Sequence, residues 1–222
     1  VDDTVNFQVY GNMEPQKAAT EAVRETEGQI LCQDGEAVEA YYFSTSAGVT
    51  STDEIWGSDE AAPYLRSVPC KFDEEEPWSS WIVELPWKML EDRIREKGEG
   101  TVLRSVTVTR RSESGAATAL EAVSDKDSCI IENEYEIRKF LAPVNCMITE
   151  KDGTETAGGS LLPSAYFELE RTQNGNLQVR GKGYGHGVGM SQTGADKMAE
   201  QGYDYREILD YFFRNITVEN LG

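Results

Sequence analysis

A run of alternate glycines near the C-terminal end of the chain is the feature that most restricts its fold. Every second residue from 181 to 189 is glycine, and His186, the single histidine of the chain, lies inside this run. On a strand, this spacing leaves one face of the backbone without side chains, while Tyr184, His186 and Val188 project from the other. A ligand or another backbone segment can then approach the bare face. The run therefore predicts a binding site or, alternatively, a tightly packed strand that leads into a helix after Met190, with His186 hydrogen-bonded in the interior.

Phosphate and nucleic-acid binding are disfavoured by motif and by charge. The glycine run lacks both Gly-x-Gly-x-x-Gly in register before a helix and the Walker pattern with its Lys-Ser/Thr. The chain carries 40 acidic and 21 basic residues, for a net charge of -19. Such a balance argues against a nucleic-acid surface and against docking on anionic lipid. We therefore predict no nucleic-acid partner.

Helix and strand patterns are mixed along the chain without a strict alternation. Helices are predicted over residues 14–28, 86–98, 132–143, 191–201 and 205–213, and strands over 79–85 and 101–111. Two tight hairpins are predicted at Asp34-Gly35 and at Asn174-Gly175, and Asp204 and Glu207 have the spacing of a capping box. We therefore expect an α+β fold in a single domain over 1–222, with a largely antiparallel β-sheet core and short flanking helices.

The cysteines and an acidic run are expected to have structural roles rather than to form a chemical site. The four cysteines, at positions 32, 70, 129 and 146, show no C-x-x-C spacing, so we expect mostly buried thiols rather than a zinc site or disulfides. The acidic run from Asp73 to Glu76 is expected to be a solvated loop.

A second informative segment is "YYFSTSAGVTSTDEIWGSDEAAPYLRSVP", residues 41–69. It places three hydroxyls at a predicted strand end and then Glu54, Trp56 and Tyr64 in a loop. Exposed aromatic rings beside hydroxyls and a carboxylate suit sugar rings, which have apolar faces and polar edges. Alternatively, Trp56 and Tyr64 anchor the loop to the core. A serine hydrolase is disfavoured because Gly-x-Ser-x-Gly is absent and only one histidine could serve as base.

Six segments together resemble one protein family. They are "FQVYG", "AVRETEGQIL", "AYYFSTSAGVTSTDEIWG", "PYLRSV", "YEIRKFL" and "GYGHGVGMSQTGADKMAEQGYDYREIL". In this order they resemble the stage II sporulation protein D family, which includes the amidase-enhancer proteins, and they span nearly the whole chain. The resemblance implies a domain of that family that lacks its N-terminal segment.

The resemblance implies a lytic transglycosylase that acts on peptidoglycan glycan strands, preferably stripped of peptides, during sporulation and engulfment. Such an enzyme cleaves between N-acetylmuramic acid (MurNAc) and N-acetylglucosamine (GlcNAc) with one carboxylic acid and leaves a 1,6-anhydro-MurNAc end. No cofactor is implied, and a cell-wall amidase is the implied protein partner. The implied location is extracytoplasmic, either secreted or anchored in the membrane through the missing N-terminal segment.

The chain departs from the family at several positions. The catalytic glutamate of the family precedes the Gln-Val-Tyr motif, which here is Gln8-Val9-Tyr10, so no residue of this sequence can be assigned that role. We therefore expect this chain alone to be inactive. Zinc-binding relatives have His-Cys where this chain has Asn6-Phe7, so no metal is predicted. Relatives also carry histidine and glycine where this chain has Phe43 and Ala47.

The positions that match the family imply a saccharide-binding cleft with no catalytic residue assigned in it. Its substrate-binding residues are predicted to be Ser44, Thr45, Ser46, Glu54, Trp56, Tyr64, Tyr184, His186 and Gln192. Two alternatives remain: a non-catalytic glycan-binding or amidase-stimulating module, and Glu54 as an acid whose pKa the neighbouring Trp56 raises.

Overall fold

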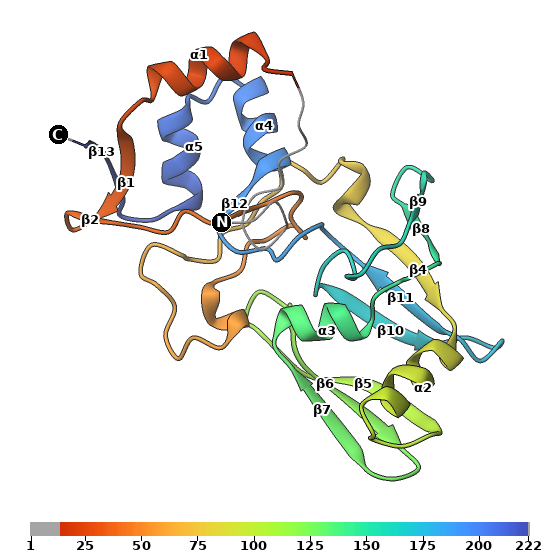
Figure 1. Cartoon of the computed structure of the whole chain (residues 1–222). Coiled ribbons are helices and arrows are strands. Elements are labelled where there is room, and N and C mark those ends of the chain that lie inside the picture. The colour runs from red at the N-terminus through yellow and green to blue at the C-terminus, as the bar shows by residue number, and fades with distance from the viewer. Residues whose placement is uncertain (1–13, 222) are drawn as a thin grey trace. The chain divides into compact units, whose positions relative to one another are not determined.

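The computed structural model describes residues 14–221, which form two compact units, one of residues 14–38 and 217–221 and one of residues 39–216 (Figure 1). The smaller unit contains helix α1 (Lys17–Glu25) and a three-stranded antiparallel sheet in the order β13-β1-β2. Its strands are β1 (Gln29–Gln33), β2 (Glu36–Ala37) and β13 (Thr217–Asn220). Strand β13 therefore brings the C-terminal segment back to the beginning of the described chain.

The hairpin between β1 and β2 confirms the prediction at Asp34-Gly35. Gln33 pairs with Glu36, which leaves a two-residue turn. Asp34 and Gly35 have φ values of 52° and 81°. Positive φ at both central residues is what a type I′ turn requires, and the Asp-Gly dipeptide adopts it at low cost.

The larger unit contains two antiparallel sheets. The five-stranded sheet has the order β10-β11-β4-β8-β9, and the three-stranded sheet has the order β5-β6-β7. The strands of the first are β4 (Trp81–Leu85), β8 (Met147–Glu150), β9 (Glu155–Ala157), β10 (Phe167–Arg171) and β11 (Leu177–Gly181). Those of the second are β5 (Leu103–Arg111), β6 (Ala117–Ser124) and β7 (Ser128–Glu132).

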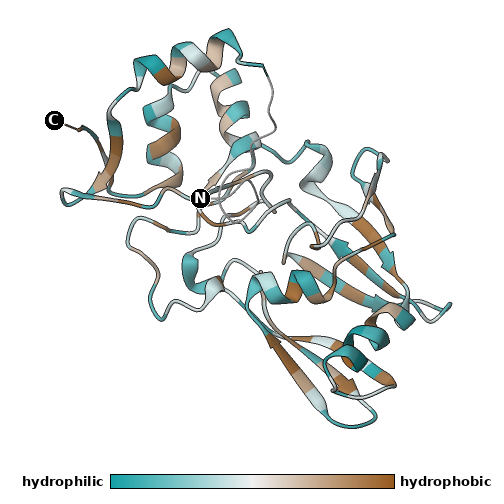
Figure 2. Cartoon of the chain, viewed as in Figure 1, coloured by the Kyte–Doolittle hydropathy of each residue, from teal (hydrophilic) through white to brown (hydrophobic). Residues whose placement is uncertain are grey.

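Both sheets contribute to one hydrophobic core, together with helices α2 (Trp87–Glu96) and α3 (Glu134–Phe140). Strand β4 turns one face toward this core, because successive side chains of a strand point to opposite faces. Its buried residues are Trp81, Val83 and Leu85, and the residues between them are exposed. Helix α2 buries Leu90 and Ile94 at helical spacing. Figure 2 shows brown apolar residues along these strands and many teal, hydrophilic residues along α2.

Two more helices follow the glycine run, α4 (Gln192–Glu200) and α5 (Tyr205–Phe212). The predicted capping box is present, because the carboxylate of Asp204 accepts from the backbone N–H of Glu207 and that of Glu207 accepts from the backbone N–H of Asp204, both at 2.9 Å. These two bonds satisfy N–H groups that have no partner inside the helix.

The described residues contain five α-helices and thirteen strands in mostly antiparallel sheets, which confirms the α+β expectation. The second hairpin differs in detail, because Thr172 pairs with Asn176 and closes a three-residue loop in which Gly175 has a φ of 81°. Strands β6 to β9 had no clear sequence signal. The single-domain assignment remains a prediction, since residues 1–13 lie outside the described part.

Candidate functional site

The glycine run does not continue as a strand, so that part of the sequence prediction is wrong. Strand β11 ends at Gly181. The four following glycines, at positions 183, 185, 187 and 189, have φ values of 76°, 111°, 84° and 80°. This left-handed region suits glycine because a Cβ would meet the backbone there. The segment from residue 183 to 189, called the glycine segment below, is therefore an irregular path that only glycine allows at every second position.

The glycines also allow another backbone to come close. A Cβ added to Gly183 would lie 2.8 Å from the carbonyl oxygen of Thr45, and one added to Gly185 would lie 2.8 Å from Cβ of Phe43. At Gly189 it would collide with the Tyr41 carbonyl. Gly183, Gly185 and Gly189 thus face residues 41–51, called the hydroxyl segment below, whereas a Cβ at Gly187 would meet the Tyr166 ring.

Backbone hydrogen bonds hold these two segments side by side. Thr45 and Tyr184 exchange both of their backbone bonds, at 3.0 and 2.8 Å, and the N–H of Ser51 donates to the carbonyl of Gly187 at 2.6 Å. Beyond them, β3 (Tyr42–Phe43) and β12 (Met190–Ser191) form a two-stranded parallel sheet. The structure therefore brings Ser44, Thr45 and Tyr184 together, as the sequence predicted.

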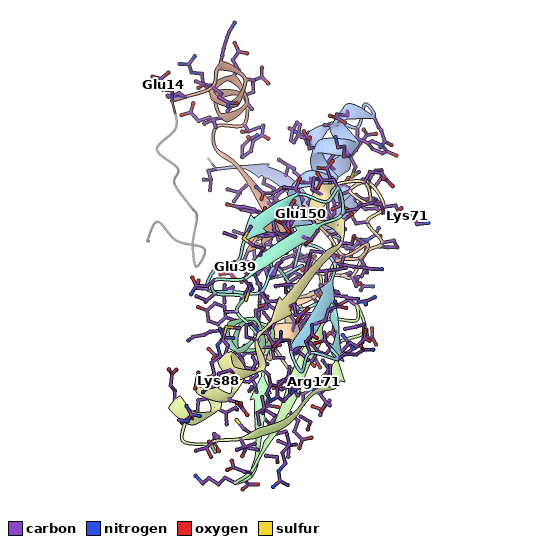
Figure 3. All side chains as sticks on the ribbon, turned by 90° about the vertical axis from the view of Figure 1, so that its right-hand side faces the viewer. Glu14, Glu39, Lys71, Lys88, Glu150 and Arg171 are labelled. Atoms are coloured by element: carbon purple, nitrogen blue, oxygen red, sulfur yellow. The ribbon has the colours of Figure 1, made fainter. Side chains whose placement is uncertain are left out.

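Asp73 is the buried centre of this arrangement, and its interpretation as part of a solvated loop is wrong. Its side chain is 1% exposed. It accepts hydrogen bonds from the backbone and the hydroxyl of Ser46, at 2.8 and 2.7 Å, and from the hydroxyl of Ser191 at 2.6 Å. Lys71, two residues earlier, is exposed and extends away from the ribbon in Figure 3. A buried carboxylate is tolerated when several donors satisfy it.

The start of α4 supplies donors that sequence reasoning missed. Ser191 caps the helix by accepting from the N–H of Gly194 at 3.2 Å. The hydroxyl of Thr193 lies 3.3 Å from that of Thr45 and 3.4 Å from Asp73, and its N–H donates to the carbonyl of Ser44 at 3.0 Å. Ser191, immediately before a helical pattern, is a cap signal that could have been found. Nothing local pointed to Asp73.

His186 is half-buried and neutral at pH 7. Its Nδ1 accepts the backbone N–H of Val188 at 3.1 Å, so the proton of the neutral ring resides on Nε2. Burial lowers the pKa of His186 to about 4, and the positive charge of Arg138 acts in the same direction, while a backbone hydrogen bond at Tyr42 opposes them. Arg138 is itself buried and ion-paired with Glu134.

Aromatic rings surround His186. The ring of Trp56, at the end of the 3₁₀ helix η1 (Asp53–Trp56), lies 5.2 Å from that of His186, and the ring of Phe43 lies 5.8 Å away. The Tyr41 ring lies edge-on to Trp56 at 5.0 Å. The ring of Trp56 is half-buried against Tyr41 and His186, as the anchoring interpretation expects, and its contact with a sugar remains a prediction.

Three predicted residues remain: Tyr64, Glu54 and Gln192. Burial raises the pKa of Tyr64, and the charges of Glu39 and Asp53 act in the same direction. Glu54 is exposed and accepts from the Thr52 hydroxyl at 2.9 Å. Gln192 is the exposed first residue of α4.

Tyr184 is 42% exposed and lies edge-on to Trp78 at 4.6 Å. Trp78 belongs to the 3₁₀ helix η2 (Pro77–Ser79), and its carbonyl accepts from the N–H of Gly183 at 2.9 Å. Sequence reasoning did not single out Trp78, although it directly follows a proline. The hydroxyl segment thus lies beside two aromatic groups: the exposed Tyr184 with the half-buried Trp78, and the rings around His186.

The search for metal sites and membrane spans covers residues 14–221. Within them, no three His, Cys, Asp or Glu side chains are placed to hold a metal ion, and no helix is long and apolar enough to cross a membrane. The four cysteines are free thiols: Cys32 and Cys70 are buried, whereas Cys129 and Cys146 are half-buried. The predictions at Asn6-Phe7 and Gln8-Val9-Tyr10 lie outside the described residues.

Comparison with known proteins places this arrangement in a family. Stage II sporulation protein D of Bacillus amyloliquefaciens is 30% identical over 98% of this chain and 59% of its own length. The protein of the same name from Bacillus subtilis is 29% identical over the same shares. The chain belongs to the stage II sporulation protein D family. The amidase enhancer of Bacillus subtilis is 24% identical over 98% of this chain and 35% of its own length.

Residues 70–189 also match a family described as "Domain of unknown function (DUF8618)", and the chain belongs to that family as well. This match begins just before Asp73 and ends with the glycine segment. The chain spans 59% or less of the length of these named stage II sporulation protein D and amidase enhancer relatives.

Proposed function

We propose that this chain binds glycan strands of peptidoglycan as the larger part of a lytic transglycosylase in sporulation-related cell-wall remodelling. The observation that carries the proposal is the convergence of Thr45, Tyr184, Trp56 and His186 along the glycine segment. The names of the relatives, stage II sporulation protein D and amidase enhancer, support a role of this kind. Because peptidoglycan lies outside the cytoplasmic membrane, the proposed location is extracytoplasmic.

The chemistry of the residues suits saccharides. An exposed ring such as Tyr184 offers a flat apolar face to a sugar ring, and hydroxyls such as Ser44 offer both a donor and an acceptor to its polar edge. Neutral His186 adds no charge, so recognition rests on stacking and hydrogen bonds. A peptide-free strand is the preferred substrate in this proposal.

Cleavage in this proposal requires one carboxylic acid. The acid protonates the glycosidic oxygen as the bond to the MurNAc anomeric carbon breaks. Its conjugate base then takes the proton of the C6 hydroxyl, whose oxygen attacks that carbon and closes the 1,6-anhydro ring. No water is consumed, unlike in the two-carboxylate glycosidases. No residue of this sequence matches the family's catalytic glutamate, so we expect the chain alone to bind strands without cleaving them.

The first test is mass spectrometry of peptide-free glycan strands after incubation with this chain or with a version extended at its N-terminus as in the relatives. The proposal expects 1,6-anhydro-MurNAc ends from the extended protein only. Ends from this chain alone would favour an acid within it, with Glu54 the first candidate. Ends from neither protein would exclude the transglycosylase.

A binding test addresses the recognition site directly. Tyr184→Ala removes the exposed ring and leaves its backbone bonds to Thr45 in place. We expect it to weaken binding of GlcNAc oligosaccharides by about 1 kcal/mol, or roughly fivefold. Tyr205→Ala is the matched control, because Tyr205 is 43% exposed at the start of α5. Equal effects of the two variants would remove Tyr184 from the proposed site.

A second candidate function is stimulation of a cell-wall amidase, which the name of the amidase enhancer relative favours. It requires no catalytic acid. Adding this chain to an amidase that digests intact peptidoglycan would test it, with the released stem peptides as readout. A rate increase that Tyr184→Ala abolishes would link the stimulation to glycan binding.

A further inference from the structure

We propose that the groove beside Trp56 is a second saccharide subsite, selective for a neutral N-acetylhexosamine over the carboxylate-bearing muramic unit. The inference rests on the proposed function and specifies which sugar this part of the site takes. The groove has a volume of about 610 Å³. This lies within the roughly 300–1,000 Å³ that is usual for small-molecule sites.

Trp56 joins the groove to the site already described. It is one of the residues that line the groove, and its ring lies 5.2 Å from that of His186. Other lining residues come from the three-stranded sheet: Arg110 and Arg111 end β5, and Glu113 lies in the turn that follows. A strand bound at His186 could therefore extend past Trp56 onto this sheet. Glu54, predicted from the sequence as a site residue, lines the groove as well.

The groove offers unpaired polar groups for sugar hydroxyls. Within residues 14–221, the Glu113 carboxylate has neither a hydrogen bond nor an ion pair. Arg110 uses its Nε for the Thr118 hydroxyl at 3.2 Å and its Nη2 for Glu132 at 3.1 Å, which leaves Nη1 without a partner in the same part of the chain. An aromatic wall with one free donor and free acceptors is the pattern that a saccharide needs.

The charges in the groove decide between the two sugars of the strand. Arg110 is paired with Glu132, and Arg111 is paired with Glu168 at 3.0 Å and bonded to two backbone carbonyls. Glu54 and Glu113 form no ion pair among the described residues, so the groove has more negative than positive charge. A muramic lactyl carboxylate would find here only arginines that already pair with a carboxylate, and it would face the unpaired carboxylates of Glu54 and Glu113, which is unfavourable in a partly desolvated site. A GlcNAc unit carries no such charge.

The experiment measures dissociation constants by calorimetry for GlcNAc oligomers of two and four units. The wild-type chain is expected to bind the tetramer more tightly than the dimer, because only the longer ligand reaches the groove. Glu113→Ala removes an acceptor that forms no hydrogen bond or ion pair with any other residue of the described range. This variant should weaken binding of the tetramer roughly tenfold, which is the effect of losing one hydrogen bond to a charged group. The dissociation constant of the dimer should stay unchanged.

A charge-reversal pair tests the selectivity. Glu113→Lys places a free cation in the groove, and it should raise several-fold the affinity for a peptide-free GlcNAc–MurNAc tetrasaccharide relative to the GlcNAc tetramer. Glu155→Lys, an exposed carboxylate on β9 of the other sheet, makes the same change in net charge and should leave that ratio at the wild-type value.

The outcomes separate this inference from the proposed function. If saccharides bind but Glu113→Ala leaves the tetramer unaffected, or Glu113→Lys and Glu155→Lys give the same ratio, the second subsite is overturned while glycan binding stands. If no saccharide of either length binds the wild-type chain, glycan recognition itself fails, and the subsite fails with it.

Discussion

At the scale of single residues, Asp73 is the least expected feature of the site. Its carboxylate is buried, and no salt bridge within residues 14–221 includes it. Hydroxyl, amide and thiol donors compensate for the lost hydration instead. Burial and the charge of Asp73 raise the pKa of the Cys70 thiol to about 12, so Cys70 stays protonated as a donor at 3.5 Å. Asp73 thereby connects the hydroxyl segment to the start of α4.

Asp73→Ala should lower the free energy of unfolding by about 3 kcal/mol, because the hydroxyls of Ser46 and Ser191 lose their buried acceptor. Asp73→Asn keeps one acceptor oxygen, so it should lower the free energy of unfolding by less than Asp73→Ala does. Urea denaturation measures both variants. Glu74→Ala changes the exposed neighbour and should stay within about 0.5 kcal/mol of wild type. Similar losses at positions 73 and 74 would show that the buried network contributes little.

His186 allows a direct titration because the chain has no other histidine. The NMR signal of the folded chain should titrate near pH 4, against a value near 6.5 for the urea-unfolded chain. Between these values the unfolded chain binds a proton that the folded chain does not, so stability rises with pH. This contribution, up to about 3 kcal/mol, is complete above about pH 6.5 and is lost as the pH falls toward 4. A folded-state midpoint near 6.5 would contradict the burial of this ring.

At the scale of elements, the glycine segment replaces the strand that its spacing indicated. Alternation of residue type predicts a strand only when successive residues adopt extended conformations. Here every second residue takes a positive φ instead. Glycine is required both for this conformation and for close approach to the hydroxyl segment. The segment therefore connects β11 to β12 along a path that packs directly against the hydroxyl segment.

Two glycine substitutions separate these two requirements. Gly189→Ala combines a positive φ with a collision at the Tyr41 carbonyl, whereas Gly202→Ala has a φ of 95° and no atom within 4 Å of the added Cβ. We expect Gly202→Ala to cost about 1 kcal/mol from conformational strain. Gly189→Ala should cost about 3 kcal/mol, because overpacking adds to the strain. Thermal and urea unfolding compare the two, and equal losses would mean that close approach has no role.

At the scale of the whole molecule, a net charge of -19 opposes binding of anionic strands. Many basic side chains of the described chain already pair with carboxylates, among them Lys88 with Asp92 and Lys151 with Glu75. Long-range steering of muramic carboxylates toward the site is therefore unfavourable.

Raising the salt concentration from about 0.01 to about 0.1 M shortens the Debye length from ~30 to ~10 Å. Screening should strengthen binding of a GlcNAc–MurNAc strand about two- to threefold, because the interaction that is screened is a repulsion. Binding of a neutral GlcNAc oligomer should not change. Calorimetry at both concentrations measures the effect. Weaker strand binding at higher salt would instead indicate a basic contact surface.

The features that the sequence determined by itself are those that depend on near neighbours. The Asp34-Gly35 turn and the Asp204–Glu207 capping box each involve only a few consecutive residues, and both formed as predicted. The family could also be identified from the sequence, because six motifs match it in order. The same resemblance grouped Thr45 and Tyr184 in one predicted cleft. Helices α2 and α5 could be predicted from their apolar periodicity and from the Pro, Asp and Gly residues that mark helix ends.

Only the tertiary structure decided which polar groups are buried and which distant side chains meet. Asp73 lies in an acidic run that looks solvated, yet Ser191, 118 positions away, bonds to it in the interior. Trp56, at the end of η1, and His186, in the glycine segment, are likewise brought together from distant parts of the sequence. Local patterns report the conformational preference of a short segment, whereas burial depends on what the rest of the chain packs against it. That packing energy is a sum over contacts distant in sequence, which no single segment encodes.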